Sequence, residues 1–155
     1  MNNPKALLAI ENFENGMNCA QSVISVFAND HGLDLSVALK LTSTLGGGIG
    51  RKQEICGAIN AGVLGLMYGN QSPNDKESKE QTSVLAQQFL TKMEKEFGGL
   101  TCRHVLGASL ETPYDREKVG EQNLTKIRCN PCIARVVSIL GQLEESKTSS
   151  IRQNK

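Results

Sequence analysis

The sequence predicts an all-α fold, a compact bundle of about six to seven helices around a central apolar helix rich in glycine and alanine. Three observations predict it. Apolar residues recur at helical spacing along most of the chain, whereas the alternation typical of strands never persists. Asparagine, aspartate and glycine stand where such segments would begin or end. One segment, CGAINAGVLGLMYG, is almost wholly apolar, so we expect it at the centre of the domain.

Four helices are predicted in the first half of the chain, over about 5–13, 18–29, 34–45 and 54–69. Asn18 and Asp34 are good N-cap residues for the second and third of these. The third would carry the apolar residues Ala38, Leu41 and Leu45 and end at residues 46–50, because four glycines in five residues hold a helix poorly. Small residues in the fourth would let neighbouring backbones approach closely.

The second half predicts the longest helix, over about 75–97, which Gly98 and Gly99 end. Its inner face carries apolar residues at every fourth position, namely Leu85, Phe89, Met93 and Phe97. A short turn after Cys102 and a weakly patterned segment over 114–128 follow. The last helix is predicted to begin at Asn130–Pro131, since proline suits a first turn. We expect residues 1–146 to form one helical domain and the polar residues 147–155 to be a disordered tail.

Charge and hydropathy exclude several classes of function. Seventeen basic and sixteen acidic residues give a net charge of +1, without the basic excess typical of nucleic-acid binding. No run of eighteen apolar residues predicts a membrane-spanning helix, and the N-terminus lacks the pattern of a signal peptide. We therefore expect a cytoplasmic protein that does not insert into membranes. In that compartment cysteines are more often metal ligands or redox groups than structural disulfides.

The five cysteines share one property, because each stands at or beside a predicted helix N-terminus. They are Cys19, Cys56, Cys102, Cys129 and Cys132. Unpaired N–H groups and the helix dipole at such a position stabilise a thiolate and lower the thiol pKa. Since a thiolate binds metals and attacks disulfides, the pattern indicates metal or redox chemistry. Buried cysteines that merely pack as small hydrophobes are the alternative.

Cys129 and Cys132 form a C-x-x-C motif, which suits metal ligation and also dithiol–disulfide exchange. No second C-x-x-C accompanies it, so a zinc finger is not predicted. The glycine-rich loop at 46–50 lacks the phosphate-binding pattern and is interpreted as a turn that lets Cys56 approach the other cysteines. Arg51 after it is expected to be a solvated charge, or else to pair with a buried anion or cluster.

Several motifs resemble one known family. The chain contains G-x-NCAQSV at 16–23, GGGIGR at 46–51, E-x-CGA at 54–58 and CR-x-x-LG at 102–107, and an apolar helix follows Cys129. In this order they resemble the C_GCAxxG_C_C family of redox-active proteins, named for a C…CGAxxG…C…C pattern. There are two departures. Ala61 stands where the family has glycine, with Gly62 displaced by one, and the fifth cysteine leaves Cys129 or Cys132 as the family's fourth.

The resemblance implies a redox role and an unknown redox partner protein. A related domain occurs in the split-Soret type of multihaem cytochrome, where cysteines are thought to hold an iron–sulfur cluster. This chain has no C-x-x-C-H haem motif. Our first hypothesis is electron transfer or redox sensing through a cluster on Cys19, Cys56, Cys102 and Cys129.

Two alternatives stay open. One is thiol–disulfide exchange by Cys129 and Cys132, with Cys56 or Cys102 as a relay. The other is a structural zinc or other soft-metal site in a helical partner-binding domain. The Gly/Ala-rich central helix would pack inside one chain or across a homodimer.

Overall fold

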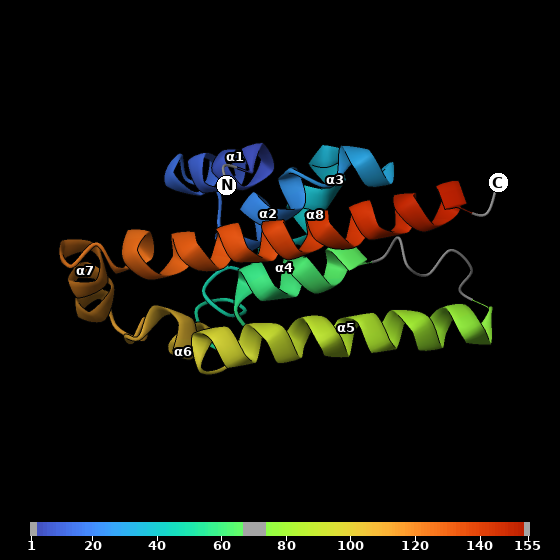
Figure 1. The fold of residues 1–155 in the computed structure, drawn as a ribbon. Helices are drawn as coiled ribbons and strands as arrows, with labels where there is room; N and C mark the ends of the chain where they lie inside the picture. The colour runs from blue at the N-terminus through green and yellow to red at the C-terminus, as the bar shows by residue number, and fades with distance from the viewer. Residues whose placement is uncertain (1–2, 67–73, 154–155) are drawn as a thin grey trace.

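The computed structural model describes residues 3–66 and 74–153, with side chains described as far as residue 143. Within these residues eight α-helices form and no sheet, which confirms the all-α class (Figure 1). The α-helices are α1 (Pro4–Glu14), α2 (Cys19–Ser25), α3 (Leu35–Leu41), α4 (Gly57–Gly65), α5 (Lys76–Phe97), α6 (Cys102–Leu106), α7 (Pro113–Glu121) and α8 (Asn130–Gln153). A 3₁₀ turn η1 (Asn29–His31) follows α2, and a π-helical turn η3 (Thr125–Cys129) leads into α8.

Helix α4 lies in the core, as its apolar sequence predicts. It packs against α2, α5 and α8, and Ala58, Ile59 and Ala61 are buried. A Cβ on Gly62 would lie 2.5 Å from Cζ of Phe89 on α5 and 2.8 Å from Cγ1 of Val136 on α8. The missing side chain therefore lets two helices close onto α4 at once. The predicted end of this helix near residue 69 lies outside the described residues.

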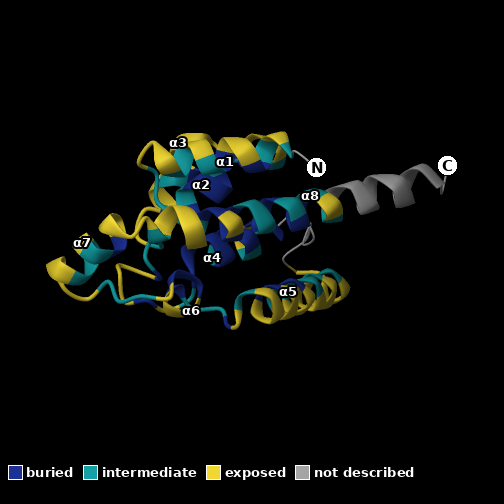
Figure 2. Cartoon of the chain, turned by 60° about the vertical axis from the view of Figure 1, so that its left-hand side comes forward, coloured by how far each residue is buried: buried dark blue, intermediate teal, exposed yellow. Residues whose placement is uncertain are grey.

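Helix α8 runs along the length of the molecule and packs against helices on both sides, while α2 and α4 also pack against each other (Figure 1). Figure 1 shows α1, α2 and α3 on one side of it and α4 and α5 on the other. Contacts of α1, α2, α4 and α5 with α8 agree with this arrangement. Figure 2 shows the buried residues concentrated on α2, α4 and the adjoining part of α8. In the described residues no helix is both long and apolar enough to cross a membrane.

Helix α5 agrees closely with its prediction. The Asp75 side chain accepts a hydrogen bond from the Ser78 N–H, and Gly98 ends the helix in the left-handed conformation with φ 74°. Of the predicted inner face, Phe89 and Met93 are buried, whereas the other two residues are partly buried. At the far end of the chain, α8 continues to Gln153, into the polar segment that the sequence sets apart as a tail.

Helices α2 and α3 are both shorter than predicted. The chain leaves α2 after Ser25 and turns at Gly32, whose φ of 68° favours glycine. Helix α3 ends at Leu41, before the predicted end near residue 45, and the Leu41 side chain is 69% exposed although it is one of the predicted apolar positions. The physical reason is length: two turns bury one residue, Ala38, against Ile24 and Ala28.

Helix α8 begins at Asn130, as predicted, but a π-helical turn leads into it without a break. The backbone is already helical at Leu124, and the Asn130 N–H bonds to the Thr125 carbonyl in a π-helical turn. A proline inside an α-helix lacks an N–H and clashes with the carbonyl four residues earlier. The π-helical turn before Pro131 locally changes that spacing, as such bulges do. Cys129 and Cys132 therefore lie inside a continuous helical segment and not at a helix N-terminus.

Candidate functional site

Cys19 is the first residue of α2, and its neighbour Asn18 fixes it in place. The Asn18 side-chain oxygen accepts hydrogen bonds from the N–H groups of Ala20 and Gln21, each at 2.9 Å. Its amide nitrogen donates to the carbonyls of Thr42 and Ser43, at 3.2 and 2.9 Å. One side chain therefore caps the helix and ties its start to the segment before the glycine-rich loop. The prediction of Asn18 as an N-cap is confirmed.

Replacing Asn18 by alanine should lower the free energy of unfolding by about 1–2 kcal/mol, since both the cap and the tie to the loop are lost. Chemical denaturation of the metal-free protein measures this. Asp34→Ala is the matched control, because it removes the cap of α3 without touching the cysteines. A loss no larger for Asn18→Ala than for the control would mean that the tie to the loop contributes nothing.

The glycine-rich loop is a left-handed turn. Five successive residues have positive φ: Gly47 (65°), Gly48 (66°), Ile49 (62°), Gly50 (59°) and Arg51 (66°). Glycine adopts this conformation freely, but a β-branched residue such as Ile49 does so at a cost of about 1–2 kcal/mol. The Gly50 N–H bonds to the Thr44 carbonyl at 2.8 Å, which helps hold the turn closed.

Gly48 brings this loop against Cys102. A Cβ on Gly48 would lie 2.7 Å from Cβ of Cys102 and 2.6 Å from the Glu54 carbonyl oxygen. The Cys102 N–H in turn donates to that carbonyl at 2.7 Å, and the Cys56 N–H donates to the Leu100 carbonyl at 2.9 Å. These two bonds flank a bridge between residues 55 and 101. They place the starts of α4 and α6, with their cysteines, side by side.

Gln53 is a positioning residue that sequence reasoning missed. Its side chain is 4% exposed, donates to the Ala108 carbonyl at 2.7 Å and accepts from the Leu110 N–H at 2.9 Å. It also hydrogen bonds with the Cys102 thiol. A lone glutamine between two exposed charged residues gives no sequence signal for such a role, because its two backbone partners are more than fifty residues away.

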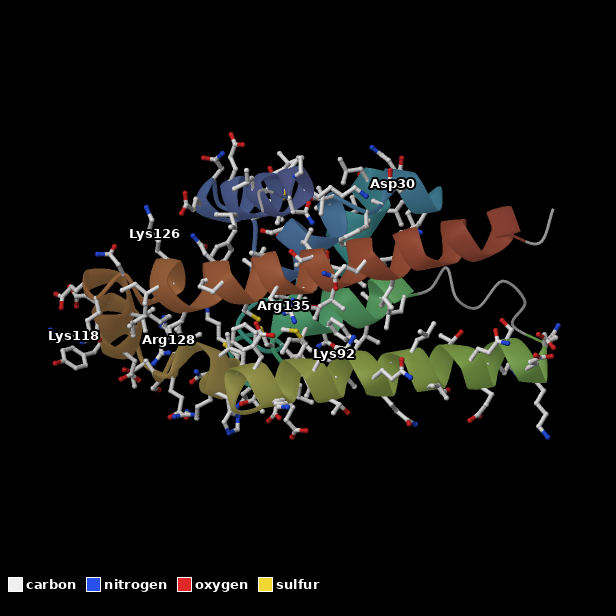
Figure 3. All side chains as sticks on the ribbon, in the orientation of Figure 1. Asp30, Lys92, Lys118, Lys126, Arg128 and Arg135 are labelled. Atoms are coloured by element: carbon white, nitrogen blue, oxygen red, sulfur yellow. The ribbon has the colours of Figure 1, made fainter. Side chains whose placement is uncertain are left out.

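The cysteines converge at this place. Cys19, Cys102 and Cys129 line one cavity of about 610 Å³. Cys56, the N-cap residue of α4, does not line that cavity but hydrogen bonds with the thiols of Cys19 and Cys132. All five are free thiols. Figure 3 shows sulfur atoms close to the start of α4. Residues from four separate segments are thus brought into one cluster of thiols, because Cys129 and Cys132 share one helical segment.

The comparisons with known proteins agree with this cluster. Residues 17–143 match the family described as "Putative redox-active protein (C_GCAxxG_C_C)". The chain belongs to this family. The resemblance seen in its motifs is confirmed, and the matched range contains all five cysteines. Neither a curated protein nor a solved structure matches the chain significantly.

The structure explains why glycine follows Cys56 in the C_GCAxxG_C_C motif. A Cβ on Gly57 would lie 2.6 Å from the Leu45 carbonyl oxygen and 2.7 Å from the sulfur of Cys19. Glycine at this position is therefore what lets Cys19 approach the start of α4. Ala61, which replaces the family's glycine, is buried in the core, and the displaced Gly62 provides the close helix contact described above.

The thiol pKa values differ from the sequence expectation of lowered values. The pKa of Cys102 is raised from 9.0 to about 11. Burial is the main cause and the nearby Cys19 adds to it, whereas the hydrogen bond from Gln53 lowers this pKa by a smaller amount. Burial, with Cys19 and Cys102 as neighbours, raises the pKa of Cys129 from 9.0 to about 12. Burial therefore outweighs any helix dipole at Cys102, and at Cys129 there is no helix start to supply one.

The pKa of Cys19 is raised by hydrogen bonding with the Cys56 thiol and by burial, although N–H groups of Gly47 and Ala58 lower it. The pKa of Cys56 is raised mainly by hydrogen bonding with the Cys132 thiol, and burial raises it too. A crowded set of neutral thiols is the result. Such thiols become thiolates when a cation takes the place of their protons.

The metal-free protein should lose stability as the pH rises from 9 to 12. Between these values the unfolded thiols of Cys102 and Cys129 ionise at their ordinary pKa of 9.0, while the folded ones still hold their protons, up to about 11 and 12. Their contribution is therefore fully present below pH 9 and decreases above it. Denaturation curves across this range test the claim, with the double Cys102→Ser, Cys129→Ser variant as the reference. A variant that loses stability as steeply as the native chain would contradict it.

The described part of the chain contains no group of three or more metal-ligating side chains (histidine, cysteine, aspartate or glutamate) that could hold a single metal ion. The two histidines do not line the thiol cavity. His104 is exposed, and its ring nitrogen Nδ1 lies 2.6 Å from the Thr101 hydroxyl at the start of α6. Its role is local to that turn.

Proposed function

We propose that this redox-active protein transfers electrons through an iron–sulfur cluster held by Cys19, Cys102 and Cys129, with Cys56 as the fourth thiol. One observation carries the proposal: thiols from three separate segments line one cavity, and no carboxylate or imidazole lines it with them. Iron–sulfur clusters take thiolate ligands almost exclusively. Cys129 is favoured over Cys132 because Cys129 lines the cavity. Cys56 also lies outside the lining, but it contacts the thiol of the lining residue Cys19, whereas Cys132 contacts Cys56.

The donor set fits a cluster better than a single ion. A zinc ion needs its ligands to converge on one point, and the described residues offer no such group. A cluster distributes its ligands over several irons, so thiols around a cavity suit it. The raised pKa values of Cys102 and Cys129 mean that iron must displace protons, and metal binding is then favoured at higher pH.

The chain supplies hydrogen bonds that stabilise thiolate ligands. N–H groups of Gly47 and Ala58 point to the sulfur of Cys19, that of Ile59 to Cys56, and the Gln53 amide to Cys102. Such donors raise the reduction potential of a bound cluster, and burial of the sulfurs limits access of water. A cluster, when bound, supplies one-electron chemistry, and a redox partner protein would deliver or accept the electron.

A reductive titration tests the proposed function. Protein purified without oxygen is reduced stepwise with dithionite and reoxidised, while the visible absorption and the electron paramagnetic resonance signal are recorded. We expect reversible, one-electron bleaching of the visible band. Absorption that does not respond to reductant, or that is lost irreversibly in one cycle, would contradict electron transfer as the role.

Thiol–disulfide exchange is the second candidate, and one observation favours it: Cys56 contacts both Cys19 and Cys132. This pairs Cys132 with Cys56 and not with Cys129 of the C-x-x-C motif. Oxidised glutathione would convert two such thiols to a disulfide, releasing two molecules of reduced glutathione. Peptide mapping after this treatment identifies the pair. The raised thiol pKa values make the attacking thiolate scarce, which is why we place this function second.

A further inference from the structure

The thiol cavity has a cationic side chain on its wall that the metal proposal does not use. Arg51 lines the cavity, and no aspartate or glutamate lies among the lining residues. The guanidinium makes no ion pair with a carboxylate of the described residues. By contrast, Arg103 pairs with Glu111 at 2.9 Å and Arg135 with Glu96 at 2.7 Å. Arg51 is exposed, so its guanidinium is open to an anion that enters the cavity from solvent.

The loop holds Arg51 in a fixed place. Its φ of 66° belongs to the left-handed turn, and its N–H bonds to the Gly46 carbonyl at 3.4 Å. A Cβ on Gly47 would lie 3.0 Å from both Cα and Cγ of Arg51, so the base of the arginine side chain lies directly over the loop. A strained backbone that fixes a side chain beside a cavity is typical of binding sites.

Two hydroxyl groups in the lining remain free to donate to a ligand. The hydroxyls of Thr44 and Thr125 make no hydrogen bond to another described group. Ser43 donates instead to the Lys40 carbonyl, and both amide hydrogens of Asn18 are used by backbone carbonyls. The polar donors available to a ligand are therefore Arg51, Thr44 and Thr125. These are donors that oxygen anions accept.

The lining also has apolar side chains, from Phe13, Leu106 and Leu110. The volume, about 610 Å³, falls within the range of small-molecule sites. An anion with a short apolar body would therefore use both parts of the wall.

We infer that the thiol cavity binds a small oxyanion, with the Arg51 guanidinium as its counter-ion and a short apolar body against Phe13, Leu106 and Leu110. The site requires no metal, because none of its donors is a thiol. It goes beyond electron transfer, since it places a small-molecule ligand beside the cysteines.

The test uses metal-free, reduced full-length protein, so its result is independent of whether a cluster forms. Amide and arginine side-chain NMR signals are followed while butyrate, sulfate or the neutral isostere butyramide is added at constant ionic strength. We expect saturable shifts at residues 46–51 with butyrate, with a dissociation constant on the order of 1 mM, and none with butyramide. Saturation by sulfate as well would show that the charge alone suffices, and its absence would show that the apolar body is needed.

Variants locate the site. Arg51→Gln should weaken butyrate binding by at least about tenfold, and Arg51→Lys by less, because lysine keeps the charge but loses the fork. Lys52→Gln is the matched control, since it removes the same charge from the next residue, which does not line the cavity. Butyrate that fails to saturate by about 50 mM, far above the expected dissociation constant, would overturn the inference. So would equal weakening by Arg51→Gln and Lys52→Gln.

Discussion

Replacing Cys102 by serine should abolish cluster binding, whereas replacing Cys132 should leave most of it. Serine keeps the size of the side chain but replaces a soft sulfur ligand with a hard hydroxyl. Cys102 lines the cavity, while Cys132 lies outside its lining and contacts Cys56. Iron and sulfide content per chain after anaerobic purification measures the effect. We expect Cys102→Ser to lower the iron content at least about tenfold, because replacing even a residue that only hydrogen bonds to a metal ligand lowers metal affinity by about that factor.

Helicity measured on both variants separates ligand loss from unfolding. Iron retained in a folded Cys102→Ser variant would remove Cys102 from the ligand set. Equal losses in the Cys102→Ser and Cys132→Ser variants would instead place the fifth cysteine among the ligands, and the assignment from the cavity would then be wrong.

Replacing Gly57 by alanine should damage both stability and the site. The added methyl group would lie 2.6 Å from the Leu45 carbonyl oxygen and 2.7 Å from the Cys19 sulfur, and the carbonyl cannot move without its loop. Overpacking of this kind costs about 1–3 kcal/mol of unfolding free energy. Since Cys19 must shift away from Cys56, we also expect iron content to fall. Chemical denaturation and metal analysis on the same preparation measure the two effects.

Gly120→Ala is the control for this substitution. Gly120 lies in α7 with nothing within 4 Å of an added Cβ, so alanine should stabilise the helix by about 0.5–1 kcal/mol. If Gly57→Ala were as harmless as Gly120→Ala, the close approach of Cys19 to α4 would not matter for the fold.

Local signals predicted the helices that depend on local chemistry. The cap Asp75 and the stop at Gly98 fixed α5 almost to the residue, and Asn18 fixed the start of α2. Asn3, whose side chain accepts from the N–H groups of Lys5 and Ala6, caps α1 in the same local way, although it was not among the predicted caps. Helix ends of this kind are decided within a few residues, so the sequence alone is informative.

Features that depend on distant residues were not predictable in this way. The sequence predicts the start of α8 at Asn130–Pro131, but it does not predict the π-helical turn that leads into α8. Cys19, Cys102 and Cys129, three of the predicted ligands, line one cavity, but no sequence signal indicates that Cys56 lies outside that lining against Cys19. The direction of the thiol pKa shifts was missed, because a helix start is visible in sequence and burial among neighbouring thiols is not.

The measurement that tests the central claim most directly is a UV–visible spectrum, with iron, sulfide and zinc analysis, of full-length protein purified without oxygen. The same analysis after incubation with ferrous iron and sulfide excludes loss during purification. The account predicts broad visible absorption with iron and acid-labile sulfide bound in fixed proportion to the chain. Colourless protein that holds zinc, or that stays metal-free with titratable thiols after the incubation, would contradict it.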